Sequence, residues 1–319
     1  METGKKPNFP PISMEPSVSL TLAGTGLHSG RYSRLKISLR PPDRGSGPAP
    51  ASPPSFIDPP GPRFRFPGMG PLRGEDLGRL PRTSNRATTL GAGDGVLATP
   101  EHLLAALLFF ASEPLDVEGD SPELPGLDGS ALPYRDALSS LFPAAAADPA
   151  WREYPSDLAW EYHWSYGYVR IRPASRFRVR WELDRGPLRQ AYLLEDAGTA
   201  FREILPARTF AFHREWRAAT AQGLMAGATD GSGLLLAESE GEYREVLARF
   251  PQWPGGPYPL LNRAAWRGEN ELAKHKILDL LGDLALLGLT LPQADIEIRN
   301  GGHAVNHLLI DRLSALAPG

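Results

Sequence analysis

The sequence contains no cysteine, so disulfides, thiolate nucleophiles and zinc sites built on cysteine are excluded. A metal ion in this chain would have to be held by histidine, aspartate or glutamate. The longest apolar run, around Leu278–Leu291, is interrupted by Asp279 and Asp283 and is too broken for a transmembrane helix. The first twenty residues lack the continuous apolar core of a signal peptide. We therefore expect a cytoplasmic protein without stable membrane insertion.

An excess of positive charge and the common catalytic motifs are also missing. The formal net charge is −3 over 319 residues, which gives no electrostatic reason to expect a nucleic-acid partner. The H-E-x-x-H, G-x-S-x-G, P-loop and G-x-G-x-x-G patterns do not occur, so peptidase, serine hydrolase, kinase and dehydrogenase activities have no support. Hydrophobic residues make up 41% and charged residues 22%, a composition typical of a soluble globular protein.

The chain is long enough for two domains, and its composition indicates where they divide. The segment AAAADPA at residues 144–150 interrupts the pattern of elements, so we predict domains at residues 1–147 and 148–319. In each half, predicted strands precede predicted helices, and a glycine-marked turn from strand to helix carries a histidine. Residues 41–82 hold 12 of the 33 prolines, which indicates a long surface excursion with one short strand at Arg63–Phe66.

Periodicity and turn residues predict the individual elements. Strands are expected at Ser17–Leu22, Leu35–Arg40, Ala87–Leu90, Gly95–Ala98, Tyr162–Ile171, Ser175–Leu183, Gly233–Ala237 and Asp295–Arg299. Helices are expected after Thr99-Pro100, with Thr99 as the N-cap, and at Leu132–Leu141, His213–Ala221, 271–288 and His303–Leu316. A glycine-rich turn with Leu27 and His28 at its tip joins the first two strands, and an ordinary hairpin loop is its simplest interpretation.

The helix predicted at residues 271–288 carries polar residues on a mostly apolar surface. His275, Asp279 and Asp283 follow one another at intervals of four and so lie on one face. A buried imidazole or carboxylate is costly unless it is paired or bound to a metal. A His–Asp pair at this spacing is nevertheless often only a surface hydrogen bond or a helix-stabilising pair. The helix alone leaves both interpretations open.

Two other predicted helices begin with residues that could take part in catalysis. Glu101 and His102 fall in the first turn after Pro100, and His303 begins the last helix. Each has a structural explanation, because a glutamate there complements the helix dipole and His102 could be a boundary residue. Two histidines and one aspartate that leave a coordination position open nevertheless suit a catalytic zinc ion, and a neighbouring glutamate suits a general base.

Six segments occur in the order found in a known enzyme family. They are AGTGLHSG, TPEHLLAAL, PELPGLDGSALPY, ARTFAF, KHKILDLLGDL and GGHAVNHLL, and they span most of residues 17–316. In this order they resemble the motifs of the UDP-3-O-acyl-N-acetylglucosamine deacetylases, the zinc amidases of lipid A biosynthesis. The resemblance implies an α+β protein of two similar domains. Each would be a β-sheet packed by helices in a layered sandwich, with the active site between the two domains.

The resemblance also implies roles for individual residues of this sequence. Zinc (Zn²⁺) would be held by His102, His275 and Asp279, with Glu101 as the general base. The general acid would be His303, hydrogen-bonded to Asp283, and the oxyanion would be stabilised by Thr209. Substrate contacts would come from Lys276 at the diphosphate and from Phe210, Phe212 and Leu27. Arg299 is a further candidate for a diphosphate contact, because its neighbour Asn300 replaces a lysine that the family usually has.

The activity that the resemblance implies is hydrolysis of the N-acetyl group of an acylated UDP-sugar, with release of acetate. We expect the protein to be a monomer. Glu101 acting alone as both base and acid is an alternative to a role for His303. A diverged, non-catalytic binder of a nucleotide sugar or an acylated ligand is the alternative to an enzyme. The presence of every candidate ligand, base and acid favours the enzyme, because a binder has no physical need for all of them.

Overall fold

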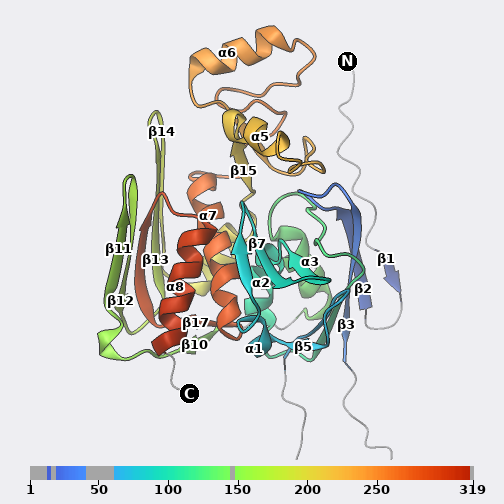
Figure 1. Ribbon diagram of the computed structural model, residues 1–319, viewed down its shortest axis with the longest axis vertical. Coiled ribbons are helices and arrows are strands. Elements are labelled where there is room, and N and C mark those ends of the chain that lie inside the picture. The colour runs from blue at the N-terminus through green and yellow to red at the C-terminus, as the bar shows by residue number, and fades with distance from the viewer. Residues whose placement is uncertain (1–12, 16–18, 41–60, 144–147, 317–319) are drawn as a thin grey trace, which may run out of the picture.

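Two β-sheets enclose a layer of helices in the computed structural model, which describes residues 13–15, 19–40, 61–143 and 148–316 (Figure 1). The middle layer holds α2 (Glu101–Leu107), α7 (Glu271–Leu284) and α8 (His303–Leu316). This arrangement confirms the predicted α+β class. The predicted domain boundary falls at residues 144–147, outside the described residues, so the division into two domains stays a prediction.

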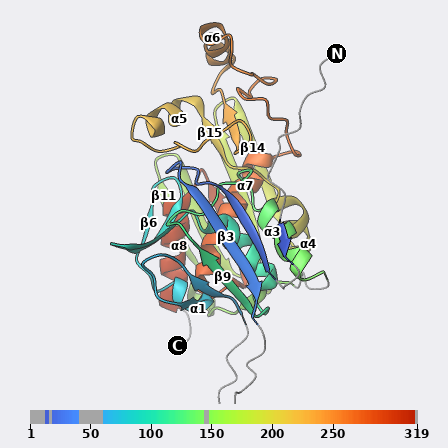
Figure 2. The same cartoon turned by 90° about the vertical axis from the view of Figure 1, so that its right-hand side faces the viewer.

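The first sheet has six strands in the order β1-β2-β3-β9-β4-β5. They are β1 (Ser13–Glu15), β2 (Ser19–Thr25), β3 (Tyr32–Leu39), β9 (Leu115–Gly119), β4 (Arg63–Arg65) and β5 (Leu72–Arg73). Neighbours run antiparallel except β4 and β9, which are parallel. Alternate residues of β3, such as Leu35 and Ile37, are buried. This alternation gives the sheet one apolar face, which covers the helices (Figure 2).

The second sheet has five strands in the order β11-β12-β18-β13-β14. They are β11 (Trp160–Trp164), β12 (Gly167–Pro173), β18 (Ala294–Arg299), β13 (Arg178–Arg185) and β14 (Leu188–Leu194). Only β13 and β18 are parallel neighbours within this sheet. Val179, Trp181, Ile296 and Ile298 are buried on its inner face, so both central strands pack against the helical layer.

Shorter elements complete the described parts of the chain. The remaining strands are β6 (Arg82–Ser84), β7 (Thr88–Ala92), β8 (Gly95–Ala98), β10 (Ala150–Arg152), β15 (Phe210–Phe212), β16 (Leu234–Leu236) and β17 (Thr290–Pro292). The remaining α-helices are α1 (Gly74–Leu77), α3 (Leu132–Leu141), α4 (Ala197–Thr199), α5 (His213–Thr220) and α6 (Glu240–Arg249). Short 3₁₀ helices lie at Leu108–Phe110, Ser156–Leu158 and Ala285–Leu287, and a π-helix lies at Ala200–Ile204. Helices α5 and α6 lie at one end of the molecule, beyond the layered body (Figure 1).

The structure corrects three sequence predictions. The strand predicted at Tyr162–Ile171 is two strands, β11 and β12, which pair through a turn between Trp164 and Gly167. Helix α6 was not predicted, because its turns carry few apolar residues. Thr99 is not the N-cap of α2: Pro100 holds that position, and Thr99 has a left-handed φ of 56° with its hydroxyl bonded to the Ala98 carbonyl.

The prediction of a surface excursion at residues 41–82 is wrong for the part that the structure describes. Residues 41–60 lie outside the described residues. Residues 61–82 form β4, β5, α1 and the first residue of β6, and Phe64 and Leu77 are fully buried in the core. The prolines of this part stand between the elements, so they interrupt the chain without keeping it at the surface.

Within the described ranges, no helix combines sufficient length with a sufficiently apolar sequence to span a membrane.

Gly282 lets α2 and α7 approach at backbone distance. A Cβ atom at this position would lie 2.0 Å from the carbonyl oxygen of Glu101 and 2.6 Å from its carbonyl carbon. Because these are backbone atoms, a larger residue could be accommodated only by moving the helices apart. Gly282 therefore sets the position of Glu101 and His102 relative to the polar residues of α7.

Gly282→Ala is expected to destabilise the protein by about 1–3 kcal/mol, because overpacking outweighs the better helix propensity of alanine. Gly241→Ala in α6 is the matched control, since a Cβ atom there would meet the Ser239 hydroxyl at an ordinary contact distance of 3.8 Å. The control is expected to be neutral or slightly stabilising. Urea denaturation of both variants measures the difference. If the two variants have the same free energy of unfolding, the backbone contact between Gly282 and Glu101 is not as tight as the structure indicates.

Candidate active site

A group of three possible metal ligands forms where α2 meets α7. One ligand atom each from His102, His275 and Asp279 lies within 4.8 Å of the others. The Asp279 Oδ1 atom is 3.2 Å from His275 Nε2 and 3.6 Å from His102 Nε2. The apolar pattern of α7 places His275 and Asp279 on a buried face, while the first turn of α2 supplies His102.

The surroundings of this group favour the protonation states that a cation requires. His275 Nδ1 donates a hydrogen bond to the Ala207 carbonyl at 3.0 Å, which leaves Nε2 free to face the other ligands. Burial lowers the pKa of His275. Burial would raise the pKa of Asp279, but neighbouring positive charge, including that of Lys276 and His303, holds that pKa well below its usual value. The pair therefore offers a neutral imidazole and an ionised carboxylate.

Glu101 lies beside this group as a buried carboxylate. Burial raises the pKa of Glu101 to about 7, against the opposing charges of His303 and His102. Its Oε1 atom is 3.7 Å from His303 Nε2, and among the described residues its Oε2 atom has no hydrogen-bond partner. A buried oxygen without a partner is costly unless a ligand or a water meets it, so Oε2 marks a place where one can bind.

His303 is held by a chain of buried hydrogen bonds that begins at Asp283. His303 Nδ1 donates to Asp283 Oδ2 at 2.8 Å, so its Nε2 faces Glu101 and Asp279, each 3.7 Å away. Burial would lower the pKa of His303, but the charges of Asp283 and Asp279 and the hydrogen bond to Asp283 raise it to about 9. The imidazole is therefore stabilised in its protonated form.

Sequence reasoning missed two partners of Asp283. Thr88 Oγ1 donates to Asp283 Oδ1 at 2.5 Å, and Asn306 Nδ2 donates to Asp283 Oδ2 at 2.8 Å. His307 in turn bonds the Thr88 hydroxyl at 2.9 Å. The spacing of His303, Asn306 and His307 along one helix could have indicated a shared polar face. No feature of the sequence points to Thr88.

Two of the candidate ligands, His102 and Asp279, line a cavity of about 620 Å³ together with His303. Its lining includes most of the predicted site residues: Leu27, Glu101, His102, Thr209, Phe210, Lys276, Asp279 and His303. His275 and Asp283 lie behind this lining. Lys276 Nζ is 2.7 Å from Asp279 Oδ2 and 5.3 Å from the centre of the Phe210 ring. The structure thus brings together residues from distant parts of the chain, as the sequence motifs required.

Two predicted substrate residues do not line this cavity. Phe212 is fully buried in a small apolar cluster with Leu183 and Leu236. Arg299 donates to Asp184 Oδ2 at 2.7 Å. Asn300, its neighbour, does line the cavity and is held by hydrogen bonds to the Asp184 amide and the Tyr166 carbonyl.

The cavity also contains residues that the sequence did not single out. These are two arginines and a row of aromatic residues at and after β11: Arg86, Arg185, Tyr162, Trp164 and Tyr166. The alternation of the aromatic residues along the strand was visible, but nothing in the sequence said which face met the site. On the opposite wall, both oxygens of Glu123 accept the amides of His28 and Ser29, which fixes the glycine-rich turn.

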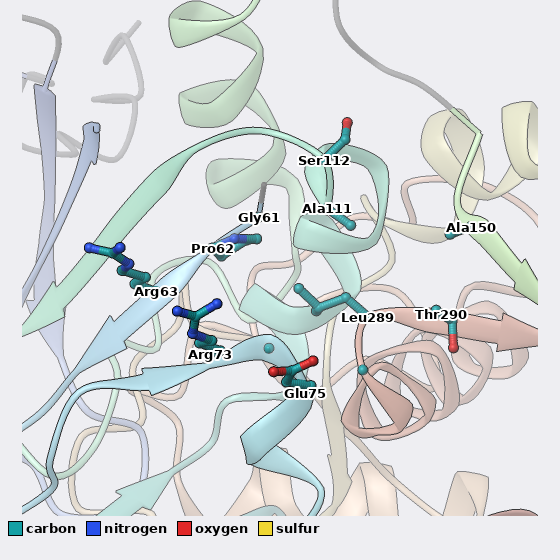
Figure 3. A pocket seen from close by; sticks show the side chains of 12 residues that line it. Gly61, Pro62, Arg63, Arg73, Glu75, Ala111, Ser112, Ala150, Leu289 and Thr290 are labelled. Atoms are coloured by element: carbon teal, nitrogen blue, oxygen red, sulfur yellow. The ribbon is translucent and has the colours of Figure 1, made fainter. Parts of the chain in front are cut away.

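Figure 3 shows a separate cavity of about 280 Å³. It lies between residues 61–75, Ala111 and Ser112 after α2, and the segment with Leu289 and Thr290. None of its lining residues in the described part of the chain is a predicted site residue. The predicted chemistry therefore belongs to the larger cavity.

Comparison with known proteins gives a family match over most of the chain. The family model described as LpxC, UDP-3-O-acyl N-acetylglycosamine deacetylase, matches residues 75–249 and 256–315. A UDP-3-O-acyl-N-acetylglucosamine deacetylase of Anaeromyxobacter dehalogenans is 30% identical over 301 residues, covering 93% of this chain and 85% of the relative. One of Myxococcus xanthus is 30% identical over 303 residues, covering 92% and 83%.

A third relative carries two activities in its name. It is the bifunctional enzyme LpxC/FabZ of Chlorobaculum tepidum, 35% identical over 246 residues, which covers 73% of this chain and 52% of the relative. The family match and the deacetylase names agree with the order of motifs. The chain therefore belongs to the LpxC family of UDP-3-O-acyl-N-acetylglucosamine deacetylases and is an amide hydrolase.

Proposed function

We propose that this protein hydrolyses the N-acetyl group of a UDP-3-O-acyl-N-acetylglucosamine in a zinc-dependent reaction of lipid A biosynthesis. Water would add to the acetyl carbon and the C–N bond would break, giving acetate and a free amine. The observation that carries the proposal is the joint position of His102, His275 and Asp279 beside the unpartnered carboxylate oxygen of Glu101. The names of the relatives supply the substrate.

The three candidate ligands fit a zinc ion. Two imidazole nitrogens and one carboxylate oxygen form a set that leaves a coordination position open for catalysis. The second nitrogen of His275 donates a hydrogen bond to the Ala207 carbonyl. A histidine that binds zinc usually has such a partner for its other ring nitrogen. When bound, zinc would lower the pKa of water toward neutrality and polarise the acetyl carbonyl.

The neighbouring side chains would move the protons. Glu101 would take a proton from the attacking water through its free Oε2 atom. The hydroxyl of Thr209, at the wall of the cavity, would donate to the developing oxyanion. His303, held by Asp283, would give a proton to the leaving amine. Glu101 acting as both base and acid is the alternative for that last step.

Positive charge in the cavity would bind the diphosphate. Lys276, Arg86 and Arg185 all line it. We propose Lys276 as the residue nearest the reaction, since it also contacts the candidate ligand Asp279. Phe210 and Leu27 would form apolar contacts with the substrate. The roles predicted for Arg299 and Phe212 would need a changed position, because one is paired with Asp184 and the other is in the core.

Other parts of the proposal concern the whole molecule. We propose a cytoplasmic monomer of two similar domains divided near residue 147. The six-stranded sheet contains only strands before that point, and the five-stranded sheet contains only strands after it. In this division, Glu101 and His102 would come from one domain, and His275, Asp279 and His303 from the other.

The direct test measures zinc content and acetate release from the acylated UDP-GlcNAc by the purified protein. Stoichiometric zinc with steady turnover supports the enzyme. Zinc or substrate binding without any turnover would instead support a diverged binder of a nucleotide sugar or an acylated ligand.

Removal of zinc by a chelator is expected to lower the melting temperature as well as the activity, because the ligands join α2 to α7. A metal present at a thousand times its Kd adds about 4 kcal/mol to the folded state. Thermal unfolding with and without chelator measures this, and added zinc should restore the loss. His275→Ala is the matched control and should respond little to chelator. If chelator leaves the melting temperature of the unaltered protein unchanged, the proposal that zinc joins α2 to α7 is wrong.

A further inference from the structure

A second, smaller cavity of about 200 Å³ opens beside the candidate active site. The two cavities share Leu27, Thr209 and Phe210, so the smaller one begins where the oxyanion residue stands. From there it runs along β15 and β16, past Leu234 and small residues such as Ala228. An extended substituent on a sugar bound in the larger cavity could therefore enter the smaller one.

The walls of the smaller cavity suit an apolar occupant. Its most buried polar side chain, Asn262, is fully engaged: Oδ1 accepts the Leu235 amide, and Nδ2 donates to the carbonyls of Asp230 and Gly233. The Ser232 hydroxyl likewise bonds the backbone of Thr229. Because these polar groups form hydrogen bonds within the wall, an alkyl chain could fill the cavity without leaving any of them unpaired.

Two tryptophans form part of the wall of this cavity. The rings of Trp216, in α5, and Trp253, after α6, meet edge to face with centroids 5.9 Å apart. Both also line a third cavity, of about 310 Å³, between α5 and α6. The pair is therefore a partition with space on either side. Trp253 packs against Phe250, with ring centroids 5.7 Å apart, and the Trp253 amide donates a hydrogen bond to the Phe250 carbonyl.

The segment that carries Trp253 lies outside the family match. The family model matches residues up to 249 and again from 256, so residues 250–255 fall between the matched parts. Those six residues include Phe250, Trp253 and Pro254, and the last two line the smaller cavity. One side of the partition is thus built from residues outside the family match.

We propose that the Trp216–Trp253 pair ends the acyl-binding cavity of this protein and so sets the longest 3-O-acyl chain that it processes efficiently. This inference rests on the proposed function, since the relatives' names supply an acylated substrate. An acyl chain that reaches the indoles would have to stop or bend into solvent. A chain within the cavity would be stabilised by apolar contact along its whole length.

The test compares kcat/KM for substrates that differ only in acyl length, in the unaltered protein and in Trp253→Ala. The variant joins the second and third cavities, so substrates longer than the original optimum should gain about fourfold per methylene, which is about 0.8 kcal/mol each. Shorter substrates should change little. Trp151→Ala is the matched control, because Trp151 is an exposed tryptophan that lines none of the three cavities.

A second variant acts in the opposite direction. Ala228→Leu fills the cavity in front of the partition and should shift the optimum to shorter chains. Should Trp253→Ala fail to fold, Trp253→Leu makes a smaller opening with the same expected direction. Substrate affinity, measured by calorimetry in a Glu101→Gln background to prevent turnover, should show the same length dependence as kcat/KM.

The outcomes separate this inference from the function on which it rests. If the Trp253 variants deacetylate with an unchanged length profile, the role proposed for the Trp216–Trp253 pair is wrong and the proposed function stands. A profile unchanged in Ala228→Leu would show that the acyl chain lies elsewhere and would also overturn it. No deacetylation of any chain length by the unaltered, zinc-loaded protein would overturn the proposed function itself.

Discussion

Glu101→Gln is expected to lower kcat by about 10²–10⁴-fold, the usual contribution of a general base. The amide keeps the size of the side chain but cannot accept the proton of the attacking water. Because the candidate ligands His102, His275 and Asp279 are untouched, zinc content should stay the same. Acetate release and metal analysis on one preparation measure both quantities.

The control for this variant is Glu269→Gln, a change of the same kind at an exposed position before α7. It should keep full activity. If Glu101→Gln loses its zinc, the loss of activity would have to be assigned to a damaged metal site. If it keeps both zinc and near-normal turnover, Glu101 is not the base, and the free Oε2 atom has another purpose.

His303→Gln is expected to have the second largest effect, again about 10²–10⁴-fold in kcat. His303 Nε2 lies 3.7 Å from Asp279 Oδ2, and its hydrogen bond to Asp283 favours the protonated ring. Glutamine could keep a polar contact but could not deliver a proton to the leaving amine. Pre-steady-state measurement of acetate and amine release should show the chemical step slowed.

Asp283→Asn provides the companion measurement. It keeps the shape of the side chain, and it removes the charge that favours protonated His303. We expect a smaller loss than in His303→Gln, since the imidazole is still present. Near-normal turnover of His303→Gln would assign both proton transfers to Glu101 and leave the Asp283 network a structural role.

Much of the site could be predicted because its residues follow local rules. Helices α3 and α8 begin and end at the predicted residues, since an apolar stripe and a preceding turn mark each of them. The polar face of α7 was visible from the spacing of His275, Asp279 and Asp283. Together with the order of the six motifs, these patterns sufficed to place His102 and His303 near that face before the fold was known.

The remaining features depend on contacts between distant segments, which no local pattern records. The bond from Thr88 to Asp283 joins residues 195 positions apart. The alternation of β18 does place Arg299 on the exposed side of its strand, but only the ion pair with Asp184 shows where its guanidinium goes. Likewise, the Trp216–Trp253 contact depends on the placement of α6, a helix whose weak apolar pattern gave no prediction.

The close approach of α2 and α7 at Gly282 also has a consequence for how the chain folds during synthesis. The buried leucines of α2, such as Leu103 and Leu107, pack in a layer that residues 271–284 complete. A ribosome makes those residues long after α2 has emerged, so the nascent N-terminal half holds an uncovered apolar helix during that interval. Contacts of such long range slow folding, because a large loop must close before they form. A chain released before α7 is made would therefore lack the candidate ligands His275 and Asp279 and expose a surface prone to aggregation.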